Sequence, residues 1–317
     1  MTPDRYEVSP DGRRRLTGFL QKRGSKLGMS TGGGFAFGGV FVATGTIIPL
    51  VGTKVLKVDP ASVQAPYWVL SLCGLSFALA GLMVWGMTWR QFAANRRRAE
   101  AASRYPGEPA LADYAWHPEG FEVSEWPGLA KAIAADVFLT IFLSIFNWWA
   151  FGGKGPTMVK IIVILVDCFL VFVWWRAARQ LGRALKFGHS RIEFTGFPCR
   201  LSKPVVLRWE PFRGIHRVNQ GTFTLRCVEE WTEERDSGEG RTSFLVQEEI
   251  WSAKWLLEQP RNFQLREEVD LRYELPADAR PTQLSADKPL FWELEVKLDL
   301  PGLDFNETYL VPVYGQG

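Results

Sequence analysis

The stretch VKIIVILVDCFLVFVWWRAARQ, residues Val159–Gln180, decides the fold class of this chain. It is apolar over most of its length and is interrupted near its middle by Asp167. An α-helix rises about 1.5 Å per residue, so about 20 apolar residues cross the hydrocarbon core of a bilayer. The stretch therefore predicts a membrane-spanning helix that carries one carboxylate deep inside it.

Three further stretches pass the same test of length and hydropathy. The four predicted spans cover about residues 33–52, 67–88, 132–151 and 157–175. The third contains Asp136 and the fourth Asp167, so buried helices of a soluble protein are the alternative interpretation for these two. We expect four transmembrane helices in an antiparallel bundle over residues 31–180.

Lysine and arginine side chains are concentrated in three segments that flank the predicted spans. They occupy a tail of residues 1–30, a loop of residues 89–131 and the residues that follow the fourth span. Cytoplasmic segments carry the excess of basic residues, and four spans place these three segments on one side. We therefore expect both termini, and the loop, in the cytoplasm.

Small and polar residues recur at helical spacing within the spans. Gly34 and Gly38 lie four residues apart, a spacing that lets two helices approach closely in lipid. The third span carries a stripe of polar side chains on one helical face: Asp136, Thr140, Ser144 and Asn147. Because spans three and four are joined by a short turn, we expect Asp167 to meet the Thr140–Ser144 part of this stripe.

Two interpretations of the polar stripe and Asp167 compete. In the first, hydrogen bonds between these side chains join two helices, and each bond contributes about 0.6 kcal/mol. In the second, Asp136 and Asp167 line a path for protons or ions, the usual suspicion for acids within a membrane. No basic partner lies at the depth of Asp167, and the spans hold few other polar groups, so we favour the first.

The second half of the chain is charged and alternates in hydropathy. In WELEVKLDL, Trp292–Leu300, apolar and charged residues alternate, which is typical of a half-buried antiparallel strand. Seven or so such short strands predict an all-β antiparallel sandwich, immunoglobulin-like or arrestin-like, over residues 185–317. The orientation above places this domain in the cytoplasm.

Two motifs resemble a known family. Residues Val269–Tyr314 contain PADAR, WELEV, PGLDF and VPV, and YPGEP at Tyr105–Pro109 is followed by Trp116. These resemble an uncharacterised family of bacterial inner-membrane proteins with four spans and a C-terminal cytoplasmic β-domain; the likeness to arrestin-like sandwiches is weaker. The family usually has tryptophan just after YPGEP, where this chain has Ala110. The resemblance implies architecture and a bacterial inner-membrane location, but no activity.

Residues that carry common chemistries are scattered along the chain. The histidines and cysteines are His117, His189, His216, Cys73, Cys168, Cys199 and Cys227. None of them lies at ligand spacing with another, and no catalytic or nucleotide-binding motif is present. We therefore predict no catalytic residue, no metal and no cofactor. The net charge of +3 is not gathered into one basic patch, which argues against nucleic acid as a partner.

An acidic segment of residues 229–249, which we expect to form a hairpin, contains Trp231 and is followed by Trp251. The two tryptophans are either a docking surface or a cross-strand packing pair, and the second is the simpler interpretation. We expect a non-enzymatic membrane protein whose β-sandwich binds protein partners or a second copy, as a scaffold or accessory subunit. The alternative is a channel, transporter subunit or membrane-perturbing effector with Asp136 and Asp167 along a polar path.

Overall fold

The chain forms two compact units in its computed structural model. The structure describes residues 6–8, 13–18, 22–24, 31–59, 66–104, 109–152, 156–236, 241–257 and 259–315. One part, called here the helical unit, comprises Gly28–Asn95 and Glu125–Ala184. The other, the β-unit, comprises Met1–Leu27, Arg96–Ser124 and Leu185–Gly317.

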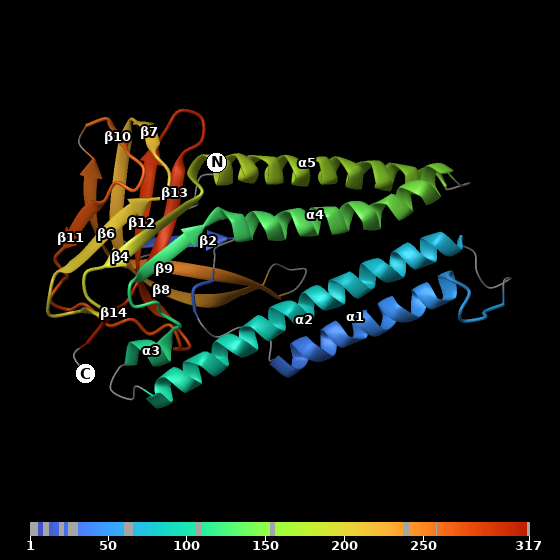
Figure 1. The fold of residues 1–317 in the computed structure, drawn as a ribbon, viewed down its shortest axis with the longest axis horizontal. Helices are drawn as coiled ribbons and strands as arrows, with labels where there is room; N and C mark the ends of the chain where they lie inside the picture. Colours follow the sequence, from blue (N-terminus) through green and yellow to red (C-terminus); the bar gives the residue numbers. More distant parts are fainter. Residues whose placement is uncertain are drawn as a thin grey trace. The chain divides into compact units, whose positions relative to one another are not determined.

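Four long helices carry the apolar half of the chain (Figure 1). They are α1 (Thr31–Gly52), α2 (Tyr67–Arg104), α4 (Glu125–Asn147) and α5 (Thr157–Phe187). A π-helical turn, η2 (Trp148–Gly152), continues α4. Within the described residues, these four helices are long and apolar enough to cross a membrane.

The helices are longer than the apolar runs that predicted them. α2 continues to Arg104 through part of the predicted loop, and α4 begins at Glu125. The extension of α2 is rich in helix-forming Ala and Arg, and Arg96 forms an i,i+4 ion pair with Glu100 at 2.9 Å. Hydropathy marks where a helix is apolar, whereas propensity and capping decide where it ends.

Glycines form a close seam between α1 and α2. Gly34 and Gly38 face Thr88 and Trp85 of α2, and the indole Nε1 of Trp85 donates to the carbonyl of Phe35 at 2.9 Å. Farther along, α1 and α2 approach at four more glycines: Gly45, Gly52, Gly74 and Gly81. A side chain at these positions would collide with the facing helix, so the seam depends on the absence of Cβ atoms.

The β-unit contains two larger antiparallel sheets, which confirms the predicted antiparallel β-structure in the C-terminal half. The six-stranded sheet has the order β1-β2-β9-β8-β12-β13 and the four-stranded sheet the order β11-β6-β4-β3. The first contains β1 (Tyr6–Val8), β2 (Arg14–Gly18), β8 (Gln220–Asp236), β9 (Arg241–Leu257), β12 (Leu290–Asp299) and β13 (Phe305–Val311). The second contains β3 (Gly120–Ser124), β4 (His189–Phe194), β6 (Val205–Pro211) and β11 (Val269–Tyr273).

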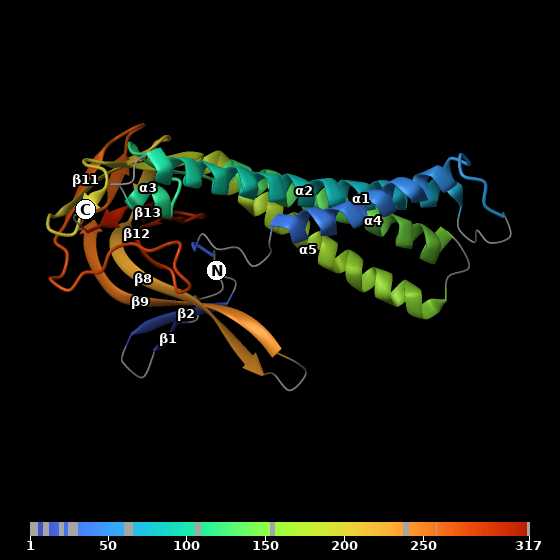
Figure 2. The ribbon, with the colours of Figure 1, turned by 90° about the horizontal axis from the view of Figure 1, so that it is seen from below.

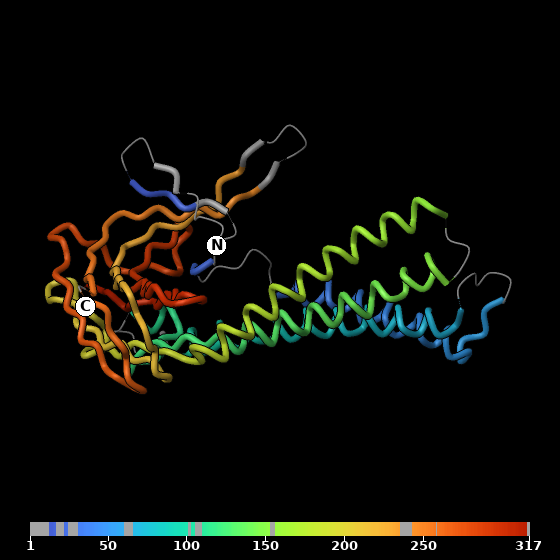
Figure 3. Tube along the Cα trace, turned by 90° about the horizontal axis from the view of Figure 1, so that it is seen from above, coloured from blue at the N-terminus to red at the C-terminus, as the bar shows by residue number. Residues whose placement is uncertain are grey.

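Smaller elements complete the β-unit. β7 (Ile215–Val218) pairs with β10 (Arg261–Phe263), and β5 (Cys199–Arg200) pairs in parallel with β14 (Val313–Tyr314). A short helix, α3 (Pro109–Asp113), precedes β3. Figure 2 shows the long β8–β9 hairpin curving beyond the rest of its sheet, and Figure 3 shows β2 running beside it.

The two larger sheets share one hydrophobic core. Trp209 and Trp292 are fully buried in it, and the hydroxyl of Tyr309 accepts from Trp209 Nε1 at 3.1 Å and bonds Ser190 Oγ at 2.6 Å. The alternation in β12 is confirmed on its apolar side. Its charged side differs from expectation, because Glu293 is only 2% exposed.

The β-unit is assembled from three stretches of the chain, whereas we predicted one domain over residues 185–317. β2 lies in the predicted tail and pairs with β9, with Arg15 opposite Glu248. β3 lies in the predicted loop and pairs with β4, with Ser124 opposite His189. Both strands are only five residues long and find partners far away in sequence, so local periodicity did not reveal them.

The seam predicts that two similar glycine substitutions have opposite effects. A Cβ at Gly45 would lie 2.2 Å from the backbone nitrogen of Ala78, whereas a Cβ at Gly86 meets nothing within 4 Å. We expect Gly45→Ala to destabilise the helical unit by about 1–3 kcal/mol through overpacking. Gly86→Ala should be neutral or stabilise by up to about 1 kcal/mol through helix propensity.

Denaturant unfolding in detergent micelles, followed by circular dichroism, measures the free energy of unfolding of the two variants and the wild type. Equal stability of the two variants would contradict the seam.

Candidate functional site

Two side-chain hydrogen bonds join α4 to α5 within the helical unit. Asn147 Nδ2 donates to Asp167 Oδ1 at 2.8 Å, and Trp174 Nε1 donates to Thr140 Oγ1 at 3.0 Å. Nearer the start of α4, Glu125 forms an ion pair with Arg183 at 2.8 Å. Three contacts along one pair of helices fix how α4 and α5 are aligned.

This alignment differs from the predicted one. Asp167 meets Asn147 and not the Thr140–Ser144 part of the stripe, and Thr140 meets Trp174. The partners are displaced by seven residues, about two helical turns. The prediction assumed equal depth from the charges that flank the apolar runs. Packing of particular side chains sets the register instead, and Ser144 Oγ donates only to the carbonyl of Ile141.

Asp136 is separate from these contacts. It is 4% exposed, and its Oδ2 has no hydrogen-bond partner among the described residues. Thr140 bonds the backbone carbonyl of Asp136 and not its carboxylate. A buried polar oxygen without a partner is costly, so Asp136 is the member of the stripe whose role packing does not explain.

Trp231 and Trp251 lie in the β8–β9 hairpin but do not form a cross-strand pair. The register places Trp231 opposite Val246 and Trp251 opposite Cys227, on either side of a β-bulge. The simpler of our two interpretations is therefore wrong about which residues pack together.

Each tryptophan has its own neighbours. The ring of Trp231 lies under Arg15 Cζ at 5.5 Å and Lys288 Nζ at 5.9 Å. The ring of Trp251 packs against Trp292, with centroids 5.4 Å apart. Both side chains are half-buried by these contacts. The two rings therefore do not form one open aromatic surface.

Buried glutamates hold the N-terminal segment to the six-stranded sheet. Glu248 accepts from Arg15 Nε at 2.6 Å and from Arg13 Nη1 at 3.2 Å. Glu230 accepts from the backbone N–H groups of Arg23 and Gly24, both at 3.0 Å. Burial alone would raise the pKa of Glu248, but the bonds from the two arginines lower it overall.

A charged pair lies beneath this segment. Arg226 Nη2 bonds Glu293 Oε1 at 2.6 Å, and Arg23 Nε lies 3.7 Å from Glu293 Oε2. Burial works against the charge of Arg226, but Glu293 and Glu295 raise its pKa overall. This network explains why the charged side of β12 is buried.

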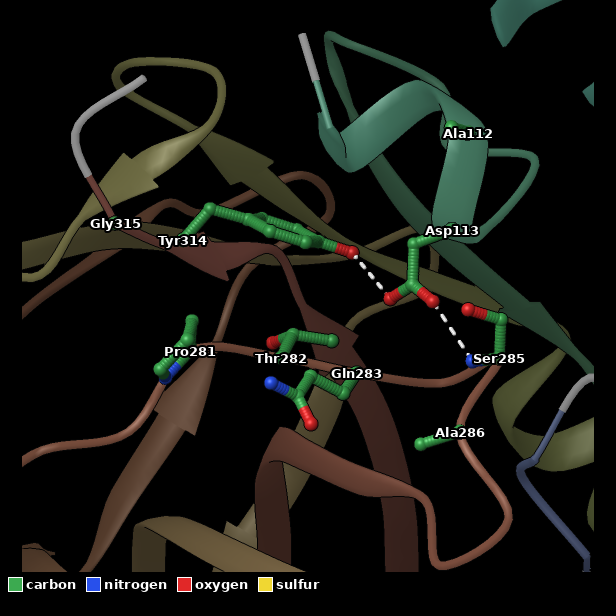
Figure 4. A pocket seen from close by; sticks show the side chains of 9 residues that line it. All are labelled: Ala112, Asp113, Pro281, Thr282, Gln283, Ser285, Ala286, Tyr314 and Gly315. Atoms are coloured by element: carbon green, nitrogen blue, oxygen red, sulfur yellow. Dashed lines mark hydrogen bonds between the residues drawn. The ribbon is translucent and has the colours of Figure 1, made fainter.

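Asp113 is the centre of a third polar cluster, shown in Figure 4. Its Oδ2 accepts from the Leu284 backbone N–H and the Tyr314 hydroxyl, both at 2.8 Å, and its Oδ1 accepts from the Ser285 N–H at 2.7 Å. Trp116 Nε1 donates to the same hydroxyl at 3.1 Å. Burial and the charge of Asp113 raise the pKa of Tyr314.

This cluster brings together the two motifs that carry the family resemblance. Ala110 and Trp116 follow the YPGEP motif, and Tyr314 ends the C-terminal motif; all three are buried in one apolar group. Ala110 is fully buried there. Residues 105–108 lie outside the described residues. Sequence reasoning missed Asp113, although its position between YPGEP and Trp116 was an available signal.

The described residues show no arrangement typical of metal or redox chemistry. No group of three or more His, Cys, Asp or Glu side chains there could hold a metal ion. Burial raises the pKa of the Cys199 and Cys227 thiols to about 12, so both are poor nucleophiles. His189 Nδ1 lies 3.1 Å from Glu122 Oε1 at an exposed position, without a third group to form a catalytic arrangement.

Comparison with known proteins gives little. No protein-family model matches the chain, and the search of curated proteins finds no match. Among solved structures, the chain is similar to the sporulation control protein Spo0M from Bacillus subtilis, with a TM-score of 0.25 and 14% identity. The match covers 39% of this chain and 48% of that chain. A likeness of this size defines neither fold nor function, and the family inferred from the motifs stays a prediction.

The contact between α4 and α5 predicts how its two polar partners respond to substitution. Asp167→Asn keeps an oxygen that can accept from Asn147, so we expect nearly unchanged stability. Asn147→Leu leaves the carboxylate of Asp167 without its donor and should cost up to about 1.7 kcal/mol. Ser144→Ala is the matched control, since Ser144 bonds only its own helix.

Unfolding in detergent micelles compares the three variants. If Asp167→Asn were as destabilising as Asn147→Leu, the hydrogen bond would not be the reason for Asp167. If Asp167→Asn folded normally but lost an ion or proton flux that the wild type shows in liposomes, the polar path would be favoured.

Proposed function

We propose that this chain is a non-enzymatic integral protein of the bacterial inner membrane. Four helices form an antiparallel transmembrane bundle, and the β-unit is a cytoplasmic sandwich that binds protein partners. It would serve as a scaffold or as an accessory subunit of a membrane complex. The observation that carries this proposal is the assembly of the β-unit from three stretches of chain, each separated from the next by two apolar helices.

This assembly supports the orientation. α1 and α2 separate β2 from β3, and α4 and α5 separate β3 from β4. If each helix crosses the bilayer once, an even number of crossings returns every stretch to the same side. The basic residues of the N-terminal segment, the loop and the end of α5 favour the cytoplasm as that side.

Two features support partner binding over catalysis. The two larger sheets share a core, as a sandwich does, and β11 pairs only with β6 among the described strands. Such an edge can pair with an extended segment of another protein. Asp270 and Arg272 are exposed on this edge, and charged edge residues suppress unspecific pairing while leaving specific pairing possible.

A second candidate is a channel, a transporter subunit or a membrane-perturbing effector. The Oδ2 of buried Asp136, which has no hydrogen-bond partner among the described residues, favours it, since acids within a membrane often mark ion or proton paths. Asp167 gives it less support, because Asn147 occupies its Oδ1. Polar helix packing accounts for Asp167 without transport.

Affinity purification of the tagged full-length chain in mild detergent tests the proposal. We expect a different protein to copurify in fixed stoichiometry, and to do so equally with Asp136→Asn. A symmetric homo-oligomer alone, with ion flux in liposomes that Asp136→Asn abolishes, would contradict the proposal and support the second candidate.

A further inference from the structure

A cavity of about 480 Å³ opens beside the Asp113 cluster in the β-unit. Its lining includes Asp113, Thr282, Gln283, Ser285, Ala286 and Tyr314 (Figure 4). Cavities of a few hundred Å³ are large enough to take one long side chain or a small molecule. The nature of the lining therefore decides what this cavity would bind.

The cavity is lined by one carboxylate, that of Asp113, and Arg200 reaches its rim, where Nη1 donates to the Gly315 carbonyl at 2.9 Å. Asp113 is 8% exposed, and the donors that hold its carboxylate are neutral: two backbone N–H groups and the Tyr314 hydroxyl. No described lysine or arginine forms an ion pair with it. Glu248 and Glu293, also buried in this unit, are each paired with arginine.

The remaining lining consists of neutral polar groups, which can both donate and accept hydrogen bonds, and apolar surface. Thr282 is 3% exposed, and its Oγ1 has no hydrogen-bond partner among the described residues. Gln283 and Ser285 place an amide and a hydroxyl at the exposed rim. Ala286 and the ring of Tyr314 supply apolar surface. The cavity thus combines an anionic group, neutral polar groups and an apolar wall.

Lysine and arginine side chains match this combination. Each has an aliphatic stem that packs on apolar surface and a cationic head that only donates hydrogen bonds. A carboxylate that accepts such a head within a partly buried pocket forms a strong, charge-assisted bond. An acidic or purely apolar side chain would leave Asp113 without a counter-charge.

We propose that the Asp113 cavity is a docking pocket for a lysine or arginine side chain of a protein partner. The inference rests on the proposed function, because it names the site and the chemistry through which the β-unit recognises its partner. Charge complementarity selects this occupant.

Peptide binding to the full-length protein in detergent micelles tests the pocket directly. The probes are fluorescein-labelled heptapeptide pools with randomised flanks and a central lysine, arginine, norleucine or glutamate. Fluorescence polarisation should show at least tenfold tighter binding of the lysine and arginine pools than of the norleucine pool. Equal binding of the four pools, or no binding at all, would overturn the inference.

Variants locate the binding. Asp113→Asn removes the charge, and Ala286→Phe fills the cavity without touching the bonds of Asp113. Both should abolish the preference for lysine and arginine. Ala115→Phe is the matched control, because Ala115 is exposed and outside the cavity lining, and it should keep the preference. An unchanged preference in Ala286→Phe would place the binding elsewhere and overturn the inference.

The same variants separate the two proposals. If the wild-type chain captures a partner and Ala286→Phe captures it equally well, the pocket inference fails while the proposed function stands. If no partner is captured but the peptide preference is present and lost in Ala286→Phe, the proposed function fails while the chemistry of the pocket stands.

Discussion

The antiparallel pairing of β3 with β4 is the constraint on which the course of the chain depends. It places Ser124 opposite His189, so the residue before α4 and a residue just after α5 are neighbours. The ion pair between Glu125 and Arg183 continues that closeness into the helices. Farther along the same two helices, Asn147 of α4 donates to Asp167 of α5. A hairpin of two long helices follows directly from the pairing of two short strands.

Contacts with a sheet also set the position of the N-terminal segment. Here ion pairs take the place of a long strand pairing. Arg13, Arg15 and Arg23 form ion pairs with Glu248 and Glu293, two buried carboxylates of the six-stranded sheet. Burying a glutamate is unfavourable unless hydrogen bonds and counter-charges compensate it. These glutamates consequently specify where the basic segment lies. The basic residues of the N-terminal segment thus have a structural role in the β-unit.

Much of the fold could be predicted from hydropathy, because the long helices are apolar over a membrane-spanning length and the apolar residues of strand β12 alternate. β2 and β3 could not, since a strand of five residues has little period and the partners β9 and β4 lie far along the chain. The pairing of Asp167 with Asn147 needed the register of two helices, which the flanking charges do not determine. Asp113 was not predicted because a single acid at the end of a five-residue helix has no spacing pattern, and only the folded chain brings Tyr314 to it.

We propose that all three stretches of the β-unit lie on one side of a membrane that the chain crosses four times. Single cysteines at exposed Lys22, Ala115, Lys203 and Lys54, in a cysteine-free background, test it with an impermeant maleimide on sealed inside-out vesicles. The account predicts labelling at Lys22, Ala115 and Lys203 from the cytoplasmic face, and at Lys54 only after the vesicles are opened. Protection of any one of the first three, while another is labelled, would contradict it.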